Sequence, residues 1–254
     1  MQFTLETPVD AVTEYLKQHD LISNTDKVLH LDKPGDGNMN MLIRVTTNET
    51  SVIVKQSRPY VNKFPQIPAP KERIHVEGKF YLMVQQDQKL REHMPKLLSK
   101  DDNNFLIVLE DLVQGNDYTY VYRKNNGLTS REVEELVLFL NRLHHASFTD
   151  AERNTFPDNM SLRKLNHEHL FHYPYVAENG FDLDTVQQGL QEASLEFKND
   201  IALKRIMVKL GNIYMSRGDV LLHGDFYPGS WLKTGYGPKV IDPEFCFFGK
   251  AENR

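Results

Sequence analysis

The chain of 254 residues has a 40% hydrophobic fraction, 26% charged residues and a net charge of −5, which is typical of a folded protein with a polar surface. The acidic balance argues against nucleic acid as a partner, because binding the phosphate backbone needs a basic surface. The apolar runs fall short of the roughly 20 residues of a membrane helix. The first residues lack a secretory pattern and the single cysteine, Cys246, excludes an internal disulfide, so we expect a cytoplasmic protein.

The first half of the chain has the pattern of a mostly antiparallel sheet that carries one long helix. Apolar residues at helical spacing predict a helix from Val9 to about residue 19. Three β-rich stretches follow at residues 27–31, 40–47 and 51–56, with turns at 34–38 and 47–49. After a proline-rich loop we expect a helix from about residue 71 to 93, and the apolar run 105–109 predicts a buried strand.

The second half changes to helices after Leu112. A capping box formed by Thr129 and Glu132 begins an amphipathic helix. A long helix is expected from about residue 184 to 216, with Gly218 as its left-handed cap. Two short strands follow at 220–222 and 239–241, and each is followed directly by a motif that contains carboxylates. The whole pattern predicts an α+β fold.

Two segments of the first half are candidate phosphate-binding elements. The glycines Gly35 and Gly37 would let backbone amides approach phosphates closely, although a plain hairpin turn is the commoner use of such a stretch. Lys55 ends a β-rich run and Glu77 lies on the next helix. An ammonium held by a carboxylate can contact the phosphates of ATP, as in protein kinases. Solvent exposure of both residues is the alternative, and Glu72 is a second candidate partner for Lys55.

Two acidic motifs follow the short strands of the second half. In His223-Gly224-Asp225, the aspartate is placed to accept or orient the proton of a substrate hydroxyl. Ser230 lies five residues on, where protein kinases place a magnesium-binding asparagine. Asp242 and Glu244 are oxygen ligands suited to a hard cation. Each motif alone is also compatible with an ordinary turn, but Asp242 follows Asp225 by 17 residues across a glycine-containing hairpin, which is typical of a catalytic loop followed by a metal loop.

These motifs resemble the aminoglycoside phosphotransferase and choline kinase superfamily, and the block Asp242-Pro243-Glu244-Phe245 is most similar to the methylthioribose kinase family. The resemblance spans about residues 30–250. It implies a protein-kinase-like bilobal fold, with an ATP-binding lobe of antiparallel sheet plus helix at 1–112 and a mainly helical lobe at 113–254. Members of this family continue past the metal loop, so we expect the second lobe to be incomplete, a truncated form.

The resemblance also implies roles for individual residues. Asp225 would be the catalytic and substrate-contacting aspartate. Trp231 is placed by its position after Ser230, not by the resemblance, and either lines the acceptor pocket or lies in the core. The metal ligands for Mg²⁺ would be Ser230, Asp242 and Glu244. The implied reaction transfers the γ-phosphate of ATP to the C1 hydroxyl of 5-methylthioribose in methionine salvage, in a protein that can be a homodimer. Another small-molecule acceptor (an aminoglycoside, a choline-like alcohol or another sugar) and an inactive nucleotide-binding fragment are the alternatives. The implied ATP-binding residues are Gly35, Gly37, Asn38, Asn40, Lys55 and Glu77, with the hinge Glu110, Asp111 and Leu112.

Overall fold

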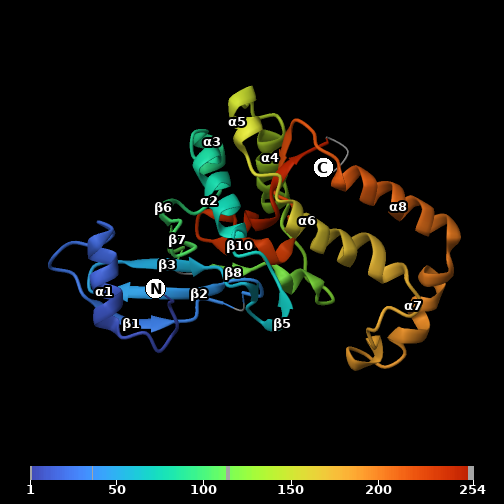
Figure 1. Ribbon diagram of the computed structural model, residues 1–254, viewed down its shortest axis with the longest axis horizontal. Coiled ribbons are helices and arrows are strands. Elements are labelled where there is room, and N and C mark those ends of the chain that lie inside the picture. Colours follow the sequence, from blue (N-terminus) through green and yellow to red (C-terminus); the bar gives the residue numbers. More distant parts are fainter. Residues whose placement is uncertain (1, 36, 113–114, 251–254) are drawn as a thin grey trace.

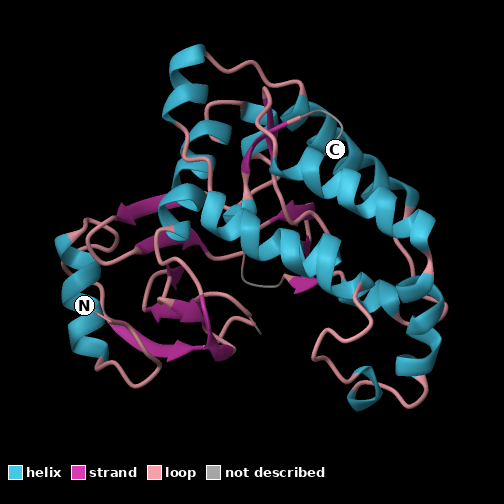
Figure 2. Ribbon diagram, turned by 45° about the vertical axis from the view of Figure 1, so that its right-hand side comes forward, coloured by secondary structure: helices cyan, strands magenta, loops and turns pink. Residues whose placement is uncertain are grey.

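The computed structural model describes residues 2–35, 37–112 and 115–250. Asp36 of the predicted glycine turn and the predicted lobe boundary at residue 113 lie outside these ranges. A twisted sheet occupies one end of the molecule, and the helices α6 (Met160–His167), α7 (Leu190–Asn199) and α8 (Ile201–Met215) extend from the other (Figure 1). Figure 2 shows the same separation of strands from helices.

The N-terminal sheet is antiparallel throughout. Its strands are β1 (Val28–Asp32), β2 (Met41–Thr47), β3 (Ser51–Gln56), β7 (Leu106–Glu110) and β6 (Leu97–Asp101), in that order across the sheet. Helix α1 (Val9–Gln18) packs on one face, in a cluster that includes Val52 and Val54. Because side chains alternate along a strand, Ile53 and Lys55 point to the opposite face, where α2 (Arg73–Val84) lies. The strand predicted at 51–56 is confirmed, and its alternation places Lys55 under α2.

The helix expected from 71 to 93 is divided in two. It stops at Val84 and resumes as α3 (Gln88–Arg91), where the Asp87 carboxylate caps the backbone N–H groups of Lys89 and Leu90. Such a cap begins a new helix and so interrupts the old one. The proline-rich loop contains a small hairpin, β4 (Tyr60–Val61) and β5 (Phe64–Pro68), which was not expected.

The capping box of Thr129 and Glu132 is confirmed at the start of α4 (Ser130–His144). The prediction of a single helix from 184 to 216 is wrong, because the segment forms the two helices α7 and α8. Asp200 ends α7 with an extended backbone and caps the Leu203 N–H at 2.9 Å to begin α8. Helix α8 ends at Met215, and Gly218 lacks the left-handed conformation expected of it. The short helix α5 (Asp150–Thr155) completes this part of the chain.

Short strands support the two acidic motifs. The strands β9 (Val220–Leu222) and β12 (Phe247–Gly249) pair, and β10 (Trp231–Thr234) forms a hairpin with β11 (Gly237–Val240). The strand β8 (Asn116–Asp117) pairs with the outer edge of β10. The motif at 223–225 follows β9, and the motif at 242–244 follows β11. The second turn packs against α2, and the His223 ring of the first lies 6.1 Å from that of Phe80 in the same helix.

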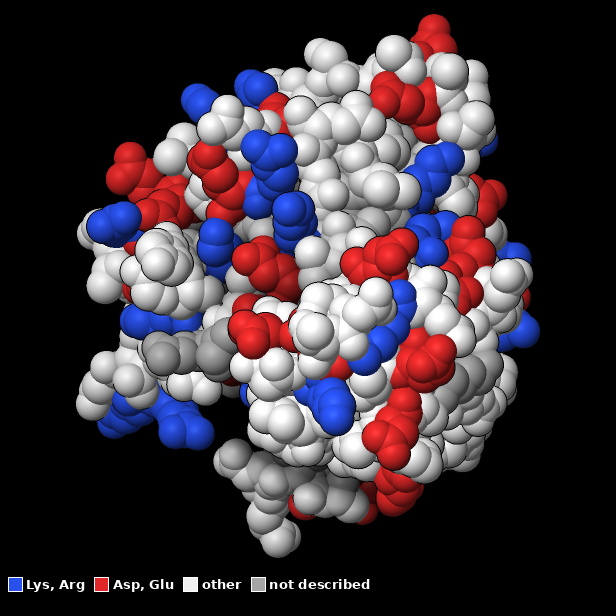
Figure 3. Space-filling model, turned by 90° about the vertical axis from the view of Figure 1, so that its left-hand side faces the viewer, with Lys and Arg blue, Asp and Glu red and all other residues white. Residues whose placement is uncertain are grey.

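One hydrophobic cluster joins the two halves of the molecule. It contains Phe80 of α2 and Ile107 of β7 together with Phe139 of α4, Val240 of β11 and Phe248 of β12. Across the described ranges, none of the helices combines the length and apolar character needed to cross a bilayer. On the face shown in Figure 3, basic and acidic side chains are interspersed rather than gathered by sign.

Candidate active site between the lobes

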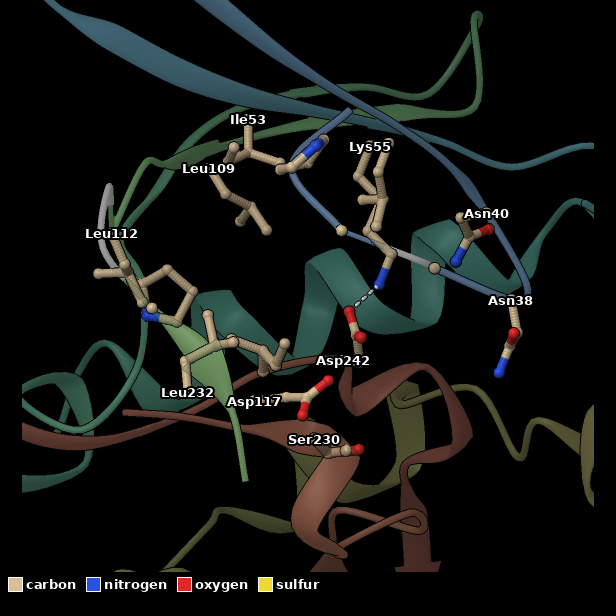
Figure 4. A pocket seen from close by; sticks show the side chains of 18 of the residues that line it. Asn38, Asn40, Ile53, Lys55, Leu109, Leu112, Asp117, Ser230, Leu232 and Asp242 are labelled. Carbon is tan, nitrogen blue, oxygen red and sulfur yellow. Dashed lines mark hydrogen bonds and ion pairs between the residues drawn. The ribbon is translucent and has the colours of Figure 1, made fainter. Parts of the chain in front are cut away.

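A cleft of about 460 Å³ lies between the sheet and two acidic turns. The first acidic turn contains residues 223–225, and the second contains residues 242–244. One end is apolar and is formed by Ile53, Leu109, Leu112 and Leu232, whereas Lys55 and Asp242 meet at the other end (Figure 4). The expected site residues that line this cleft are Gly35, Gly37, Asn38, Asn40, Lys55, Glu110, Asp111, Leu112, Asp225, Ser230, Asp242 and Glu244.

Lys55 links the sheet, α2 and the second acidic turn. Its Nζ lies 2.8 Å from Glu77 Oε1 and 2.6 Å from Asp242 Oδ1, and its side chain is only 2% exposed. Glu77 is fully buried behind the cleft, while the alternative partner Glu72 is exposed before α2. Burial alone would lower the pKa of Lys55, but Asp242, Glu77 and Glu244 together raise it well above its usual value. The ammonium therefore stays charged.

The first acidic turn is held against the second by His223. The buried His223 Nε2 donates to the Ile241 carbonyl at 2.9 Å, and Nδ1 accepts from the Asp225 N–H at 3.3 Å. Burial lowers the pKa of His223 to about 4, so the imidazole is neutral, as this pattern of one donor and one acceptor requires. Gly224 between them has a φ of +84°, and a Cβ there would lie 2.1 Å from the Phe245 carbonyl oxygen.

Three carboxylates face the polar end of the cleft. Burial, with the nearby charges of Glu244 and Asp242, raises the pKa of Asp225 to about 7. Burial also raises the pKa of Glu244. This excess of negative charge fits a divalent cation, and carboxylate and hydroxyl oxygens are ligands that suit Mg²⁺. In the part of the chain that the structure describes, no three His, Cys, Asp or Glu side chains are arranged to hold a metal, so a cation would need phosphate or water oxygens as further ligands.

The second acidic turn is shaped by an unusual backbone. Asp242 has φ 59° and ψ 50°, in the left-handed region that non-glycine residues rarely adopt, and Pro243 begins the turn Pro243–Phe245. The N–H of Ile241 donates to the Ser230 carbonyl at 2.9 Å, which places Ser230 next to this turn. The predicted metal residues therefore share one wall of the cleft.

The expected hinge begins at Glu110, the last residue of β7, and lines the cleft. The Asp111 side chain is 2% exposed and turns toward the sheet, where it accepts from Arg44 Nε at 2.8 Å and from Ser51 Oγ at 2.7 Å. Glu110 Oε2 accepts from the Lys96 N–H at 3.0 Å. With both carboxylates bound to neighbouring elements, the hinge is anchored to the sheet.

Some placements differ from what the sequence suggested. Trp231 packs against Phe226 and Tyr118, at ring-centroid distances of 5.0 and 6.3 Å, and does not belong to the lining of the cleft. Asn40, expected to bind ATP, has its side-chain amide already paired, because Nδ2 donates to Glu244 Oε2 at 2.8 Å. The apolar lining was also not expected, although the alternation along 51–56 signals that Ile53 shares a face with Lys55. Asp117, which lines the cleft near Ser230 and Asp242, carried no signal (Figure 4).

Comparisons with known proteins agree on one family. The sequence profile of the phosphotransferase enzyme family matches residues 43–252. Methylthioribose kinase of Yersinia pseudotuberculosis is 28% identical over 256 residues, which cover 96% of this chain and 60% of the relative. Methylthioribose kinase 1 of Oryza sativa subsp. japonica is 26% identical over 236 residues, 87% of this chain and 53% of the relative. The chain thus spans between half and two thirds of these curated relatives.

Solved structures share the fold at low sequence identity. Spectinomycin phosphotransferase in complex with ADP and spectinomycin has a TM-score of 0.56 at 12% identity, and covers 95% of this chain and 70% of its own. The gentamicin complex of APH(2″)-IIa has a TM-score of 0.52 at 16% identity, with 99% and 74% covered. These similarities confirm the expected α+β, protein-kinase-like fold. Since the family profile covers most of its length, this chain belongs to the phosphotransferase enzyme family.

Proposed function

We propose that this chain is an ATP- and magnesium-dependent small-molecule kinase whose acceptor is 5-methylthioribose. The observation that carries the proposal is the 2.6 Å ion pair between Lys55 of β3 and Asp242 of the second acidic turn. It brings a buried ammonium from the sheet to the wall that holds Asp225 and Glu244, in one cleft. We assign the sheet and α2 to an ATP-binding lobe at 1–112 and the acidic turns to a second lobe at 113–254.

The two ends of the cleft suit the two ends of a nucleotide. A planar base fits between the aliphatic side chains of Ile53, Leu109 and Leu232, next to the backbone of the hinge. The phosphates would then reach Lys55, whose charge the surrounding carboxylates maintain, and the glycine turn. Bound Mg²⁺ would be held by Asp242, Glu244 and Ser230, and it supplies the charge that neutralises phosphate oxygens.

Asp225 has the environment of a catalytic base. Its pKa of about 7 leaves an appreciable fraction of the carboxylate ionised at neutral pH and makes that carboxylate a better proton acceptor than an exposed one. The acceptor hydroxyl oxygen forms a bond to the γ-phosphorus, the bond from that phosphorus to the bridging oxygen of ADP breaks, and Asp225 takes the hydroxyl proton. His223 keeps Asp225 in place through its backbone N–H.

The choice of acceptor is supported by sequence similarity at two levels, one motif and the whole chain. The motif Asp242-Pro243-Glu244-Phe245 resembles that of methylthioribose kinases. The curated relatives that align over 96% of this chain carry that name. We therefore propose transfer to the C1 hydroxyl of 5-methylthioribose, as a cytoplasmic step of methionine salvage.

The test is to incubate the chain with ATP, Mg²⁺ and separately methylthioribose, choline or spectinomycin, and to follow ADP release and product mass. We expect a phosphorylated product with methylthioribose alone. A product with another acceptor only would refute the acceptor, and nucleotide binding without any product would refute the kinase.

Asp225→Asn should reduce the rate by about 10³-fold or more, because the proton acceptor is lost while the nucleotide contacts remain. Asp219→Asn is the matched control, since Asp219 is exposed and lies six residues earlier. Equal rates for the two variants would contradict the role given to Asp225.

A further inference from the structure

A second buried cation, Arg73, lies behind the polar end of the cleft. It is the first residue of α2, it is 1% exposed, and it is not part of the lining. A guanidinium has five N–H donors, and each one of Arg73 is used. Nε donates to Asn40 Oδ1 at 2.9 Å. The other acceptors are the carbonyl oxygens of Arg58 and Pro70 for Nη1, both at 2.8 Å, and of Met39 and Tyr60 for Nη2, at 2.7 and 3.4 Å.

These contacts determine which way the Asn40 amide faces. Its Oδ1 must accept from Arg73, because a guanidinium only donates. Its Nδ2 is therefore directed to Glu244 Oε2, at 2.8 Å. The two residues are 204 positions apart, one beside the glycine turn and the other in the second acidic turn. Arg73 thus orients Asn40, and Asn40 orients Glu244.

The charge of Arg73 acts on the same carboxylate. Its hydrogen-bond acceptors are neutral, and Glu244 Oε2 lies 3.5 Å from Nε as its ion-pair partner. Burial lowers the pKa of Arg73 and Glu244 raises it, but a guanidinium stays charged at neutral pH. Both contacts use Oε2, so neither of them engages Oε1 of Glu244, a residue that lines the cleft.

We propose that Arg73 is a positioning residue that joins the glycine turn to the metal loop. Through Asn40 it holds one oxygen of Glu244 and presents the carboxylate to the cleft in a single orientation. The nucleotide and the cation would then bind to a carboxylate that is already ordered. This lowers the loss of side-chain entropy that accompanies binding. The effect on nucleotide and cation binding rests on the proposed function. The hydrogen-bonded link from Arg73 through Asn40 to Glu244 does not depend on a ligand.

The link is tested first by exchanging its two polar partners. Asn40→Asp keeps an acceptor for Arg73 but places a carboxylate against Glu244, and Glu244→Gln removes the ionic partner of Arg73. Asn40→Asp should lower the denaturant midpoint, because it sets two carboxylates against each other at the 2.8 Å contact. The double variant reverses the donor and acceptor and should recover most of the loss. A double variant less stable than both single variants would overturn the link, whatever the catalytic activity of the chain.

The positioning role is tested with Arg73→Lys, which keeps the charge but loses the planar fork. ADP binding is measured by thermal shift with Mg²⁺ and with EDTA. We expect about a tenfold weaker affinity with Mg²⁺ and little change with EDTA. Arg163→Lys is the matched control, because Arg163 is also fully buried and donates to the Tyr214 and Ser216 carbonyls, away from the cleft.

The outcomes separate the inference from the proposed function. Unchanged Mg²⁺-dependent affinity in Arg73→Lys, or an equal loss in Arg163→Lys, would refute the positioning role. If Arg73→Lys does not fold, the exchange of Asn40 and Glu244 still decides whether the link exists. No ADP binding by the unmodified chain would contradict the proposed function and leave the exchange experiment valid.

Discussion

At the scale of single residues, the buried carboxyl of Asp225, our proposed catalytic base, reduces the stability of the fold. Its folded-state pKa of about 7 lies above the usual value of an unfolded chain, 3.8, because of burial and the charges of Glu244 and Asp242. Between these values the folded state binds more protons than the unfolded state. The folded state therefore loses stability as the pH rises from about 4 to 7, and the penalty is fully present above pH 7.

Asp225→Asn should consequently stabilise the fold while it removes activity. At pH 8 we expect a rise in Tm on the order of a few degrees, and at pH 5 a much smaller one, because the wild-type carboxyl is then mostly protonated. Thermal unfolding at both pH values measures the difference. Asp219→Asn, at the exposed site, should change Tm little at either pH. A lower Tm for Asp225→Asn at pH 8 would contradict the raised pKa.

The same carboxyl should control the pH dependence of catalysis. If Asp225 accepts the proton, only its ionised form is active, so kcat/KM should rise about tenfold per pH unit below pH 7 and level off above it. His223 should not contribute a second transition in this range, since its pKa is near 4. Initial rates from pH 5 to 9 test this, and a profile that is flat between pH 5 and 7 would exclude Asp225 as the base.

At the scale of elements, the sequence predicted the helices and strands that depend on neighbouring residues. It did not predict the features that depend on contacts between distant residues or on a single capping side chain. Strand β3 and the capping box of α4 follow from neighbours in the sequence. The helix breaks at Asp87 and Asp200 were not predicted, because each depends on one side chain capping the next helix inside a helix-like stretch. The edge strand β6 was not predicted either, since its pattern is only partly apolar.

The candidate site divides in the same way. The two acidic motifs could be predicted as site residues because each directly follows a short strand. Lys55 could be predicted because it lies at the end of another strand. Arg73 carried no signal, because an arginine at the start of a helix is usually exposed. Its role depends on Asn40 and Glu244, which only the folded chain brings together.

The approach of the two acidic turns predicts a strong effect for one glycine. Gly224→Ala should cost on the order of 3–5 kcal/mol, because the new Cβ combines a left-handed backbone with the contact to the Phe245 carbonyl. Gly180→Ala isolates the backbone effect, since Gly180 has a φ of +79° and nothing within 4 Å of the added Cβ. That variant should cost about 1–2 kcal/mol. Urea unfolding compares them, and equal losses would show that the turns do not pack this closely.

At the scale of the whole molecule, the two lobes share their interior. The cluster that contains Phe80 and Ile107 of the first lobe also contains Phe139, Val240 and Phe248 of the second. The ion pair from Lys55 to Asp242 and the link from Arg73 to Glu244 cross the same boundary. A boundary crossed by a continuous core and by buried polar contacts should not separate independent folding units. The lobes differ in architecture but should unfold together.

The single tryptophan makes this cooperativity measurable. Trp231 belongs to the second lobe, whereas Val54 is 1% exposed in the cluster under α1 in the first. Val54→Ala should destabilise the fold by about 2 kcal/mol. It should shift the denaturant midpoint reported by Trp231 fluorescence as far as the midpoint from far-UV circular dichroism. Val186→Ala, at a side chain that is 78% exposed, should shift neither. A Trp231 midpoint that stays unchanged in Val54→Ala would mean that the lobes unfold separately, in spite of the core they share.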